Sequence, residues 1–305
     1  GLTVPLGPVE IEVIRNALTA AAAEMDVTVW RTSRSTIVRE LLDYSTAVFD
    51  AEGNNLAQSA RIPSHLNSMS HLLRELLERH VDPAAWGPDD VVVTNDPYCG
   101  GQHLPDIVAF KPVVHEGKRI AFVGTLCHHI DVGGLAAGSY AAKAIEIFQE
   151  GLRIPPVKLV EGGRRNDGVW AMILQNVRKP DLLAGDLQSQ IASLEVGAAA
   201  LRRLAGRYGA EAMLEAGGRI LDMSEAAMRS AIARMPDGTY EFEDFLDDDG
   251  VDLGKPIRLH VALTVAGDAI AVDLSGCSPQ ARGPVNATLA SSNAAVMFAV
   301  MCACD

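Results

Sequence analysis

The segment 91–134 constrains the fold of this chain more than any other part of the sequence. Residues 107–114 and 120–126 are two apolar runs rich in β-branched side chains, a composition typical of β-strands. The sequence His-Glu-Gly-Lys at 115–118 lies between them and is a turn signal. We therefore predict an antiparallel hairpin that turns at Gly117.

The register of this hairpin brings two potential ligands together. Asp106 and His128 each lie eleven residues from Gly117, on opposite sides of the turn. Residues directly opposite in an antiparallel pair have Cβ atoms about 5 Å apart, close enough to share an ion. His103 precedes Asp106 by one short loop turn. Two imidazoles and a carboxylate suit Zn²⁺, Mn²⁺ or Fe²⁺, so we predict a metal site at the open end of the hairpin.

A purely structural interpretation of the same residues remains open. Histidines at strand ends often serve as hydrogen-bonded caps, and an Asp that follows Pro, as Asp106 does, is an ordinary turn residue. Cys127 precedes His128, and neighbouring strand residues point to opposite faces, so we expect Cys127 to pack in the core. The glycine-rich segment 131–138 allows close backbone approach to a ligand but lacks the Gly-Lys-Ser/Thr ending of a P-loop.

The rest of the chain predicts an α+β fold with mixed or antiparallel sheets and long packed helices. The expected helices cover residues 8–25, 66–80 (with Ser64 as N-cap), 181–208, 210–235 (with a break at Gly217-Gly218) and 291–305, and the further strands cover 46–50, 91–94, 239–246, 257–265 and 269–274. From this order we expect a metal-site α+β domain over 1–180, a helical segment over 181–237 and a β-rich region over 238–305. The last of these runs into an apolar helix, which suggests a fragment of a larger subunit.

Composition excludes several classes of partner. The chain has 305 residues, with 39 acidic against 26 basic side chains and a net charge of −13, which argues against binding a nucleic-acid backbone. No apolar run approaches the roughly 20 residues that span a bilayer, so no membrane association is expected. The five cysteines form no Cys-x-x-Cys pair, and the start of the chain does not look like a signal peptide. These features predict a cytoplasmic protein with reduced thiols.

Several motifs together resemble those of a known family. The matching stretches are Thr-Asn-Asp-Pro-Tyr at 94–98, Gly100-Gly101, His-Leu-Pro-Asp at 103–106, His128-His129 with Asp131 and Gly133-Gly134, Ile-Pro-Ser-His-Leu at 62–66, Glu-Gly-Leu-Arg-Ile-Pro-Pro at 150–156, and Asp-Leu-Ser-Gly at 273–276 with Pro279-Gln280 and Asn286. In this order they resemble the B subunit of the hydantoinase/oxoprolinase family, the N-methylhydantoinase B type. That family includes caprolactamase and the metal-bearing subunit of acetone- and acetophenone-type carboxylases. Its members are usually much longer, which again suggests a fragment.

The resemblance implies a fuller metal site. It adds Asp43, from a Leu-Asp-Tyr-Ser motif, as a ligand beside His103, Asp106 and His128. It also implies that His129 either points to the opposite face or orients a ligand without itself touching the ion. Asp96, Asp131 and His65 are the candidates for proton transfer, and the sequence favours none of them.

The resemblance also implies the reaction and its partners. A hydantoinase A-type subunit would use ATP to phosphorylate a cyclic amide, and this chain would complete the hydrolysis with its divalent ion, Zn²⁺ or Mn²⁺, with Fe²⁺ possible, in a hetero-oligomer. Two alternatives remain. In the first, the chain is the metal-bearing subunit of an ATP-dependent ketone carboxylase. In the second, it is a non-catalytic scaffold subunit with a structural metal.

Overall fold

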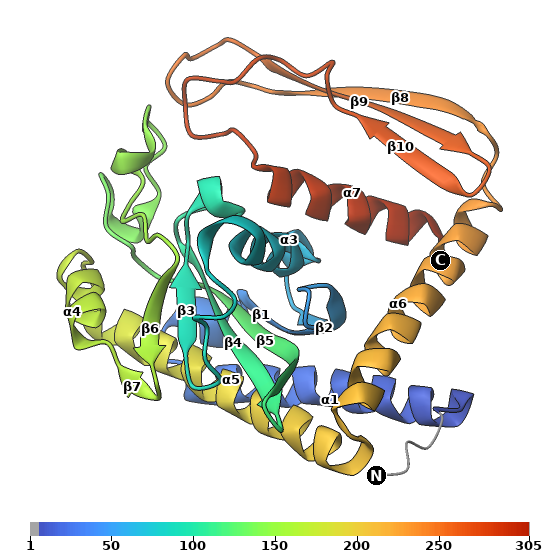
Figure 1. The fold of residues 1–305 in the computed structure, drawn as a ribbon. Coiled ribbons are helices and arrows are strands. Elements are labelled where there is room, and N and C mark those ends of the chain that lie inside the picture. Colours follow the sequence, from blue (N-terminus) through green and yellow to red (C-terminus); the bar gives the residue numbers. More distant parts are fainter. Residues whose placement is uncertain (1–5, 305) are drawn as a thin grey trace.

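The computed structural model describes residues 6–304 and confirms an α+β fold built on antiparallel sheets (Figure 1). The main sheet has seven strands in the order β2-β1-β5-β4-β3-β6-β7. These strands are β1 Tyr44–Phe49, β2 Asn55–Ala60, β3 Val91–Thr94, β4 Asp106–His115, β5 Lys118–His128, β6 Val157–Glu161 and β7 Arg164–Arg165. The helices are α1 Pro8–Thr32, α2 Thr36–Arg39, α3 Ser68–Glu75, α4 Asp167–Gln175, α5 Pro180–Tyr208, α6 Ala210–Ile232 and α7 Leu289–Cys304.

Helices cover both faces of the main sheet, and this explains the continuous apolar runs of its central strands. On β4, Ile107 and Ala109 belong to the core that includes α1 and α5. Val108 and Phe110, which alternate with them, belong to the core on the other face, which includes α3. Consecutive strand residues point to opposite faces, so every position in the middle of β4 is buried.

The long helices α1 and α5 pack along each other on one face of the sheet, as Figure 1 shows. Helix α5 buries an apolar stripe that includes Leu187, Leu194 and Leu201. The approach is close at Gly197, where a Cβ would lie 2.9 Å from Met25 Cγ of α1. Because α5 also packs on β4 and β5, residues 181–208 share the core of the first 180 residues.

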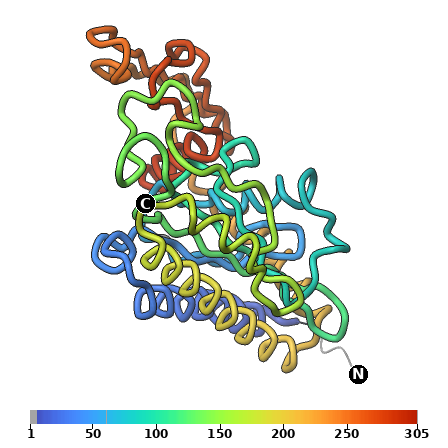
Figure 2. Tube along the Cα trace, turned by 90° about the vertical axis from the view of Figure 1, so that its left-hand side faces the viewer, coloured from blue at the N-terminus to red at the C-terminus, as the bar shows by residue number. Residues whose placement is uncertain are grey.

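The C-terminal region adds a second sheet in the order β10-β9-β8. Its strands are β8 Gly238–Leu246, β9 Ile257–Ala266 and β10 Ala269–Asp273, all antiparallel. Helix α6 leads from the end of α5 to this sheet, and α7 returns to contact α3 (Figure 1). In Figure 2 the C-terminal strands lie at the end of the molecule far from α1. None of the described helices combines the length and apolarity needed to cross a bilayer.

Four local predictions differ from the structure. Helix α1 continues past Met25 to Thr32. Ser64 lies in a 3₁₀ turn, and the N-cap position of α3 is held instead by Asn67, with φ 56°. The predicted break in α6 is absent, because Gly217 is buried in ordinary contact with Leu56 and the helix runs through it. Strands β2, β6 and β7 and helices α2 and α4 were not predicted.

Candidate metal centre

The hairpin of β4 and β5 has the register that the sequence predicts, with Asp106 directly opposite His128. The two strands sit at the centre of the sheet, and the pair lies at their open end, away from the turn. The backbone N–H of Asp106 donates to the carbonyl of His103 at 3.0 Å, closing a tight turn that brings the His103 ring back to the strand end. The sheet and this turn together fix the three side chains.

The side chains of His103, Asp106 and His128 converge on one point. Asp106 Oδ1 lies 2.9 Å from His103 Nε2 and 3.3 Å from His128 Nδ1. The two ring nitrogens are themselves 3.2 Å apart. One potential ligand atom from each residue lies within 4.8 Å of the others, which fits a shared divalent ion.

Asp43 lies beside this group, outside its tightest cluster. Leu42 has φ 57°, and this left-handed residue turns the chain from α2 into β1 just before Asp43. Asp43 accepts a hydrogen bond at its carbonyl from the backbone N–H of His128, 3.0 Å. Its Oδ2 lies 3.9 Å from His128 Nδ1. A small side-chain movement would therefore bring the carboxylate to an ion held by the other three residues.

His65 also faces the site. Its ring is buried, with Nδ1 2.9 Å from Ser45 Oγ and Nε2 3.5 Å from Asp43 Oδ1. Burial lowers the pKa of His65, and the nearby carboxylates of Asp106 and Asp43 oppose that shift only in part. The ring is therefore neutral near pH 7, with Nε2 directed at Asp43.

The contact between Asp106 and His103 shifts their pKa values in opposite directions. Burial alone would raise the pKa of Asp106, but the imidazoles of His103 and His128 outweigh it and lower that pKa well below the ordinary range. Burial alone would lower the pKa of His103, and the Asp106 carboxylate outweighs it and raises that pKa. Asp106 thus stays ionised, and protons compete with any ion for His103.

One buried atom supports the fit of an ion to these residues. Asp106 Oδ1 is inaccessible to solvent and accepts no hydrogen bond from any described residue that meets normal geometry. The nearest side-chain nitrogens to Oδ1 are those of His103 and His128, at 2.9 and 3.3 Å. A divalent ion between Oδ1 and the two imidazoles would satisfy it, and the set of one carboxylate and two imidazoles is suited to Zn²⁺, Mn²⁺ or Fe²⁺.

His129 points away from this cluster toward α5. Its Nε2 donates to Gln190 Oε1 at 3.0 Å, and its backbone N–H donates to the carbonyl of Pro105 at 2.8 Å. The Gln190 amide donates in turn to the carbonyl of Ile107 at 2.9 Å and lies 3.1 Å from Thr125 Oγ1. His129 and Gln190 therefore tie the site ends of β4 and β5 to the helix beneath them.

The carboxylates of Asp96 and Asp131 are engaged in loop structure. Asp96 Oδ1 accepts from the Tyr98 N–H at 3.0 Å, and its Oδ2 lies 3.5 Å from Arg153 Nε. Asp131 accepts from the backbone N–H groups of Gly133 and Gly138 and from both the backbone and the guanidinium of Arg178. These contacts account for both oxygens of Asp131.

A cavity of about 360 Å³ opens beside His103. Tyr140 and Glu150 line it from one side, and Asp248, Asp249 and Val285 line it from the C-terminal region. The Tyr140 ring centroid lies 6.2 Å from that of His128. Burial raises the pKa of Glu150, while the nearby His103 opposes that shift. The volume is in the range of small-molecule sites, roughly 300–1,000 Å³.

Three residues around the centre were not predicted, namely Tyr140, Glu150 and Gln190. Only Gln190 carried a signal that could have been used. It lies three residues after Leu187 and four before Leu194, so it is a polar residue within the apolar stripe of α5. A polar side chain at such a position must find a buried partner.

Comparison with known proteins identifies the family. The model of the Hydantoinase B/oxoprolinase family matches residues 7–305. The chain belongs to this family. Among the relatives is the beta subunit of the caprolactamase of Pseudomonas jessenii, 33% identical over 294 residues, which cover 96% of this chain and 50% of that protein. The B subunit of a putative D-/L-hydantoinase of Pseudomonas sp. (strain NS671) is 33% identical over 297 residues, covering 93% of this chain and 49% of that protein.

Two solved structures have the same fold. The crystal structure of the ATP-dependent caprolactamase from Pseudomonas jessenii superposes with a TM-score of 0.91 at 32% identity, covering 98% of this chain and 51% of that chain. A nucleotide-free acetone carboxylase structure superposes with a TM-score of 0.88 at 21% identity, covering 95% and 40%, and this likeness concerns the fold alone. The chain spans about half the length of the curated relatives cited above.

Proposed function

We propose that this chain is the metal-bearing part of an ATP-dependent cyclic-amide hydrolase. The observation that carries the proposal is the convergence of His103, Asp106 and His128 beside a cavity of small-molecule size. Membership of the Hydantoinase B/oxoprolinase family supports it, because relatives are named as hydantoinase and caprolactamase subunits. We further propose an A-type partner subunit that activates the amide by phosphorylation with ATP.

In this proposal each residue has a defined task. His103, Asp106 and His128 hold one divalent ion, with Asp43 completing the set. The ion, when bound, supplies Lewis acidity at the activated carbon centre. The buried Asp106 carboxylate keeps negative charge beside the two imidazoles, and the cavity lined by Tyr140 receives the substrate.

Among the three candidates for proton transfer, the contacts favour His65. Its ring is neutral near pH 7 because burial lowers its pKa, so one of its two nitrogens carries no proton and can accept one. Its Nε2 faces Asp43, 3.5 Å away, at the edge of the metal cluster. Asp96 and Asp131 already have their carboxylates in hydrogen bonds and ion pairs of their own loops. We propose that these two aspartates organise the loops around the site.

The decisive experiment compares metal content and turnover in three proteins. The wild type, His103→Ala and His115→Ala are purified, and bound metals are measured by elemental analysis. His115 lies at the far end of the same hairpin and serves as the matched control. We expect about one equivalent of a transition metal in the wild type and His115→Ala, and none in His103→Ala. Cyclic-amide turnover with ATP and the partner subunit should disappear together with the metal.

Turnover by a metal-free His103→Ala protein would refute the assignment. Loss of metal and stability in that variant, with turnover intact, would favour a scaffold subunit with a structural ion.

The fold likeness to acetone carboxylase favours a second candidate, a ketone carboxylase subunit. In that reaction the same centre would act on an activated ketone and CO₂ in place of an amide and water. Assays of the complex with cyclic amides, and separately with a ketone and bicarbonate, distinguish the two. ATP consumption that depends only on the ketone and bicarbonate would overturn the hydrolase proposal.

A further inference from the structure

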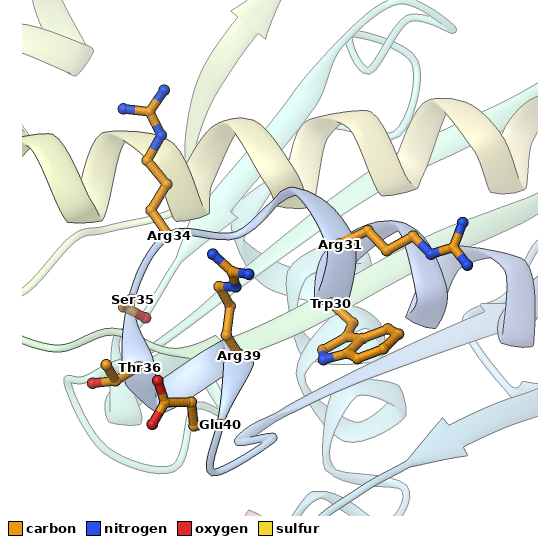
Figure 3. A pocket seen from close by; sticks show the side chains of 7 residues that line it. All are labelled: Trp30, Arg31, Arg34, Ser35, Thr36, Arg39 and Glu40. Atoms are coloured by element: carbon orange, nitrogen blue, oxygen red, sulfur yellow. The ribbon is translucent and has the colours of Figure 1, made fainter.

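The end of α1 and the short helix α2 enclose a second pocket, built from a much shorter stretch of chain than the metal centre. Its volume is about 550 Å³, and Figure 3 shows the side chains that line it. Three of them are the arginines Arg31, Arg34 and Arg39, which come from the last turn of α1, the connecting loop and the end of α2. The metal cluster contributes no residue to this pocket.

The three guanidinium groups have no protein partner. Within residues 6–304, no carboxylate lies within ion-pair distance of Arg31, Arg34 or Arg39, and none of the three guanidiniums donates a hydrogen bond. By contrast, Arg61, Arg153 and Arg178 each pair with a carboxylate. Glu40 contributes one carboxylate to the same lining, so the pocket places three unpaired guanidiniums against one acidic side chain, on a chain whose net charge is −13.

The pocket has a rigid frame. Asp186 of α5 is fully buried, and its Oδ1 accepts hydrogen bonds from the backbone N–H groups of Arg34 and Ser35 at 2.6 and 3.1 Å. Ser35 Oγ accepts from the Val38 N–H and caps α2. The stem of Arg34 lies across Gly185, where an added Cβ would be 2.7 Å from Arg34 Cγ. The arginines thus extend from fixed backbone positions.

An aromatic surface lies next to the arginines. Trp30 lines the same pocket and is 45% exposed, whereas Trp86 and Trp170 are buried. Guanidinium groups bind phosphate through paired, charge-assisted hydrogen bonds. An exposed indole provides a face on which a planar group can stack. The volume is also in the range of small-ligand sites.

From these features we propose that the pocket binds a small phosphorylated ligand that also carries a planar group. The phosphates contact Arg34 and Arg39, with Arg31 adding charge, and the planar group packs on Trp30. This binding is independent of the metal centre and of the hydrolase proposal.

Titration of the purified protein with pyrophosphate and with ADP tests the proposal. EDTA is present throughout, so that chelated metal cannot contribute, and affinity is measured by calorimetry. We expect both probes to bind with a stoichiometry of one, and ADP to bind more tightly. Removing one guanidinium contact in Arg39→Gln should weaken both by about tenfold or more. Trp30→Phe should remove the change in intrinsic fluorescence that ADP causes, because the planar group packs on Trp30, which is 45% exposed.

The matched control is Arg203→Gln. Arg203 is exposed on the same α5 helix that frames the pocket, but it lies roughly 27 Å along the helix from Gly185. The Arg203→Gln and His103→Ala proteins should both bind pyrophosphate and ADP with the affinities of the wild type. Absence of binding by the wild type, or equal affinities in Arg39→Gln and Arg203→Gln, would overturn the proposal. Equal affinities of the wild type for ADP and pyrophosphate would overturn the role of Trp30.

Discussion

Individual residues at the metal centre are held by neighbours that touch neither ion nor substrate. Gln190 shows this most clearly, because one buried amide joins α5, β4, β5 and the His129 ring. Asp131 has the same kind of role in the loop after β5, where its carboxylate accepts hydrogen bonds from backbone N–H groups and from the Arg178 guanidinium. Substitutions at both residues lead to measurable predictions.

Replacing Gln190 with Leu should destabilise the protein by about 1–3 kcal/mol, because the His129 N–H and the Ile107 carbonyl lose their buried partner. Urea unfolding followed by circular dichroism measures the change. Gln188 lies on the exposed face of the same helix, so Gln188→Leu provides the control and should change stability by less than about 0.5 kcal/mol. Equal effects of the two substitutions would contradict the role assigned to Gln190.

The contribution of Asp131 to stability should depend on pH. Burial raises its pKa, but hydrogen bonds from the backbone N–H groups of Arg178 and Gly133 and from the Arg178 guanidinium outweigh burial, so the pKa in the folded state is lowered. Its stabilisation is therefore complete above the unfolded-state pKa of about 3.9 and is lost as pH falls through the folded-state pKa.

We accordingly expect Asp131→Asn to cost about 1.5–3 kcal/mol at pH 7, with a smaller difference from the wild type near pH 3. Denaturant unfolding at a series of pH values measures it. Asp222→Asn, at an exposed position on α6, should show little difference at any pH. If the difference in unfolding free energy between the wild type and Asp131→Asn stays constant from pH 7 to pH 3, the charged hydrogen bonds do not stabilise the protein as proposed.

The sequence allows part of this residue-level picture to be predicted. The equal distances of Asp106 and His128 from Gly117 predicted their pairing, and the structure has it. The pairing also depends on a register shift between Val113 and Val114, which the sequence did not predict, because the turn itself sets His115 opposite Lys118. Asp43 follows from no such spacing. It reaches the site through the left-handed turn at Leu42 and the pairing of β1 with β5, both of which depend on tertiary structure. Only the family resemblance pointed to it.

Among the secondary-structure elements, the contact between α1 and α5 is sensitive to side-chain size. Gly197 lets the helices approach so closely that a methyl group there would meet Met25 and lie 3.1 Å from Val123 Cγ1 of β5. Gly206 lies on the same helix with open space around it. These two glycines give opposite predictions for the same substitution.

Gly197→Ala should destabilise the protein by about 1–3 kcal/mol, because overpacking outweighs the gain in helix propensity. Gly206→Ala should stabilise it by up to ~1 kcal/mol, because it gains propensity without a clash. Thermal unfolding followed by circular dichroism compares the two. Stabilisation by both substitutions would show that the α1–α5 contact accommodates an added methyl group without loss of stability.

Elements with strong periodicity were predictable, and short edge elements were not. The long α5 helix and the β4–β5 hairpin have regular apolar patterns over many residues, and the structure confirms them. Strand β7 has two residues, too few for a pattern to emerge, and a lysine and a glutamate interrupt the apolar residues of β6. The Gly217-Gly218 pair suggested a break, but packing on the β1–β2 hairpin keeps α6 continuous, so tertiary contacts override local propensity.

At the scale of the whole molecule, the metal centre joins parts of the chain that are distant in sequence. Its candidate ligands come from the turn before β1, the loop before β4, the start of β4 and the end of β5, and the C-terminal region lines the cavity beside it. An ion bound only by the folded arrangement must stabilise that arrangement by mass action.

Metal binding should therefore raise the melting temperature of the wild type. A free ion concentration 100 times Kd corresponds to a stabilisation of about 2.7 kcal/mol. Differential scanning fluorimetry of the metal-free protein, with and without added Zn²⁺ or Mn²⁺, measures the shift. His103→Ala should show no shift at the same concentrations, while His115→Ala should behave like the wild type. A shift of equal size in His103→Ala would place the stabilising ion elsewhere.

The long β4–β5 hairpin separates its turn from the metal centre by about ten residues of strand, or roughly 33 Å. Gly117, at the tip, has open space around it, while neighbouring strands hold the other end of the hairpin in register. The turn is consequently a natural attachment point for a fluorophore or a surface tether. A probe fixed there could report on assembly with a partner while the chemistry at the opposite end of the strands proceeds undisturbed.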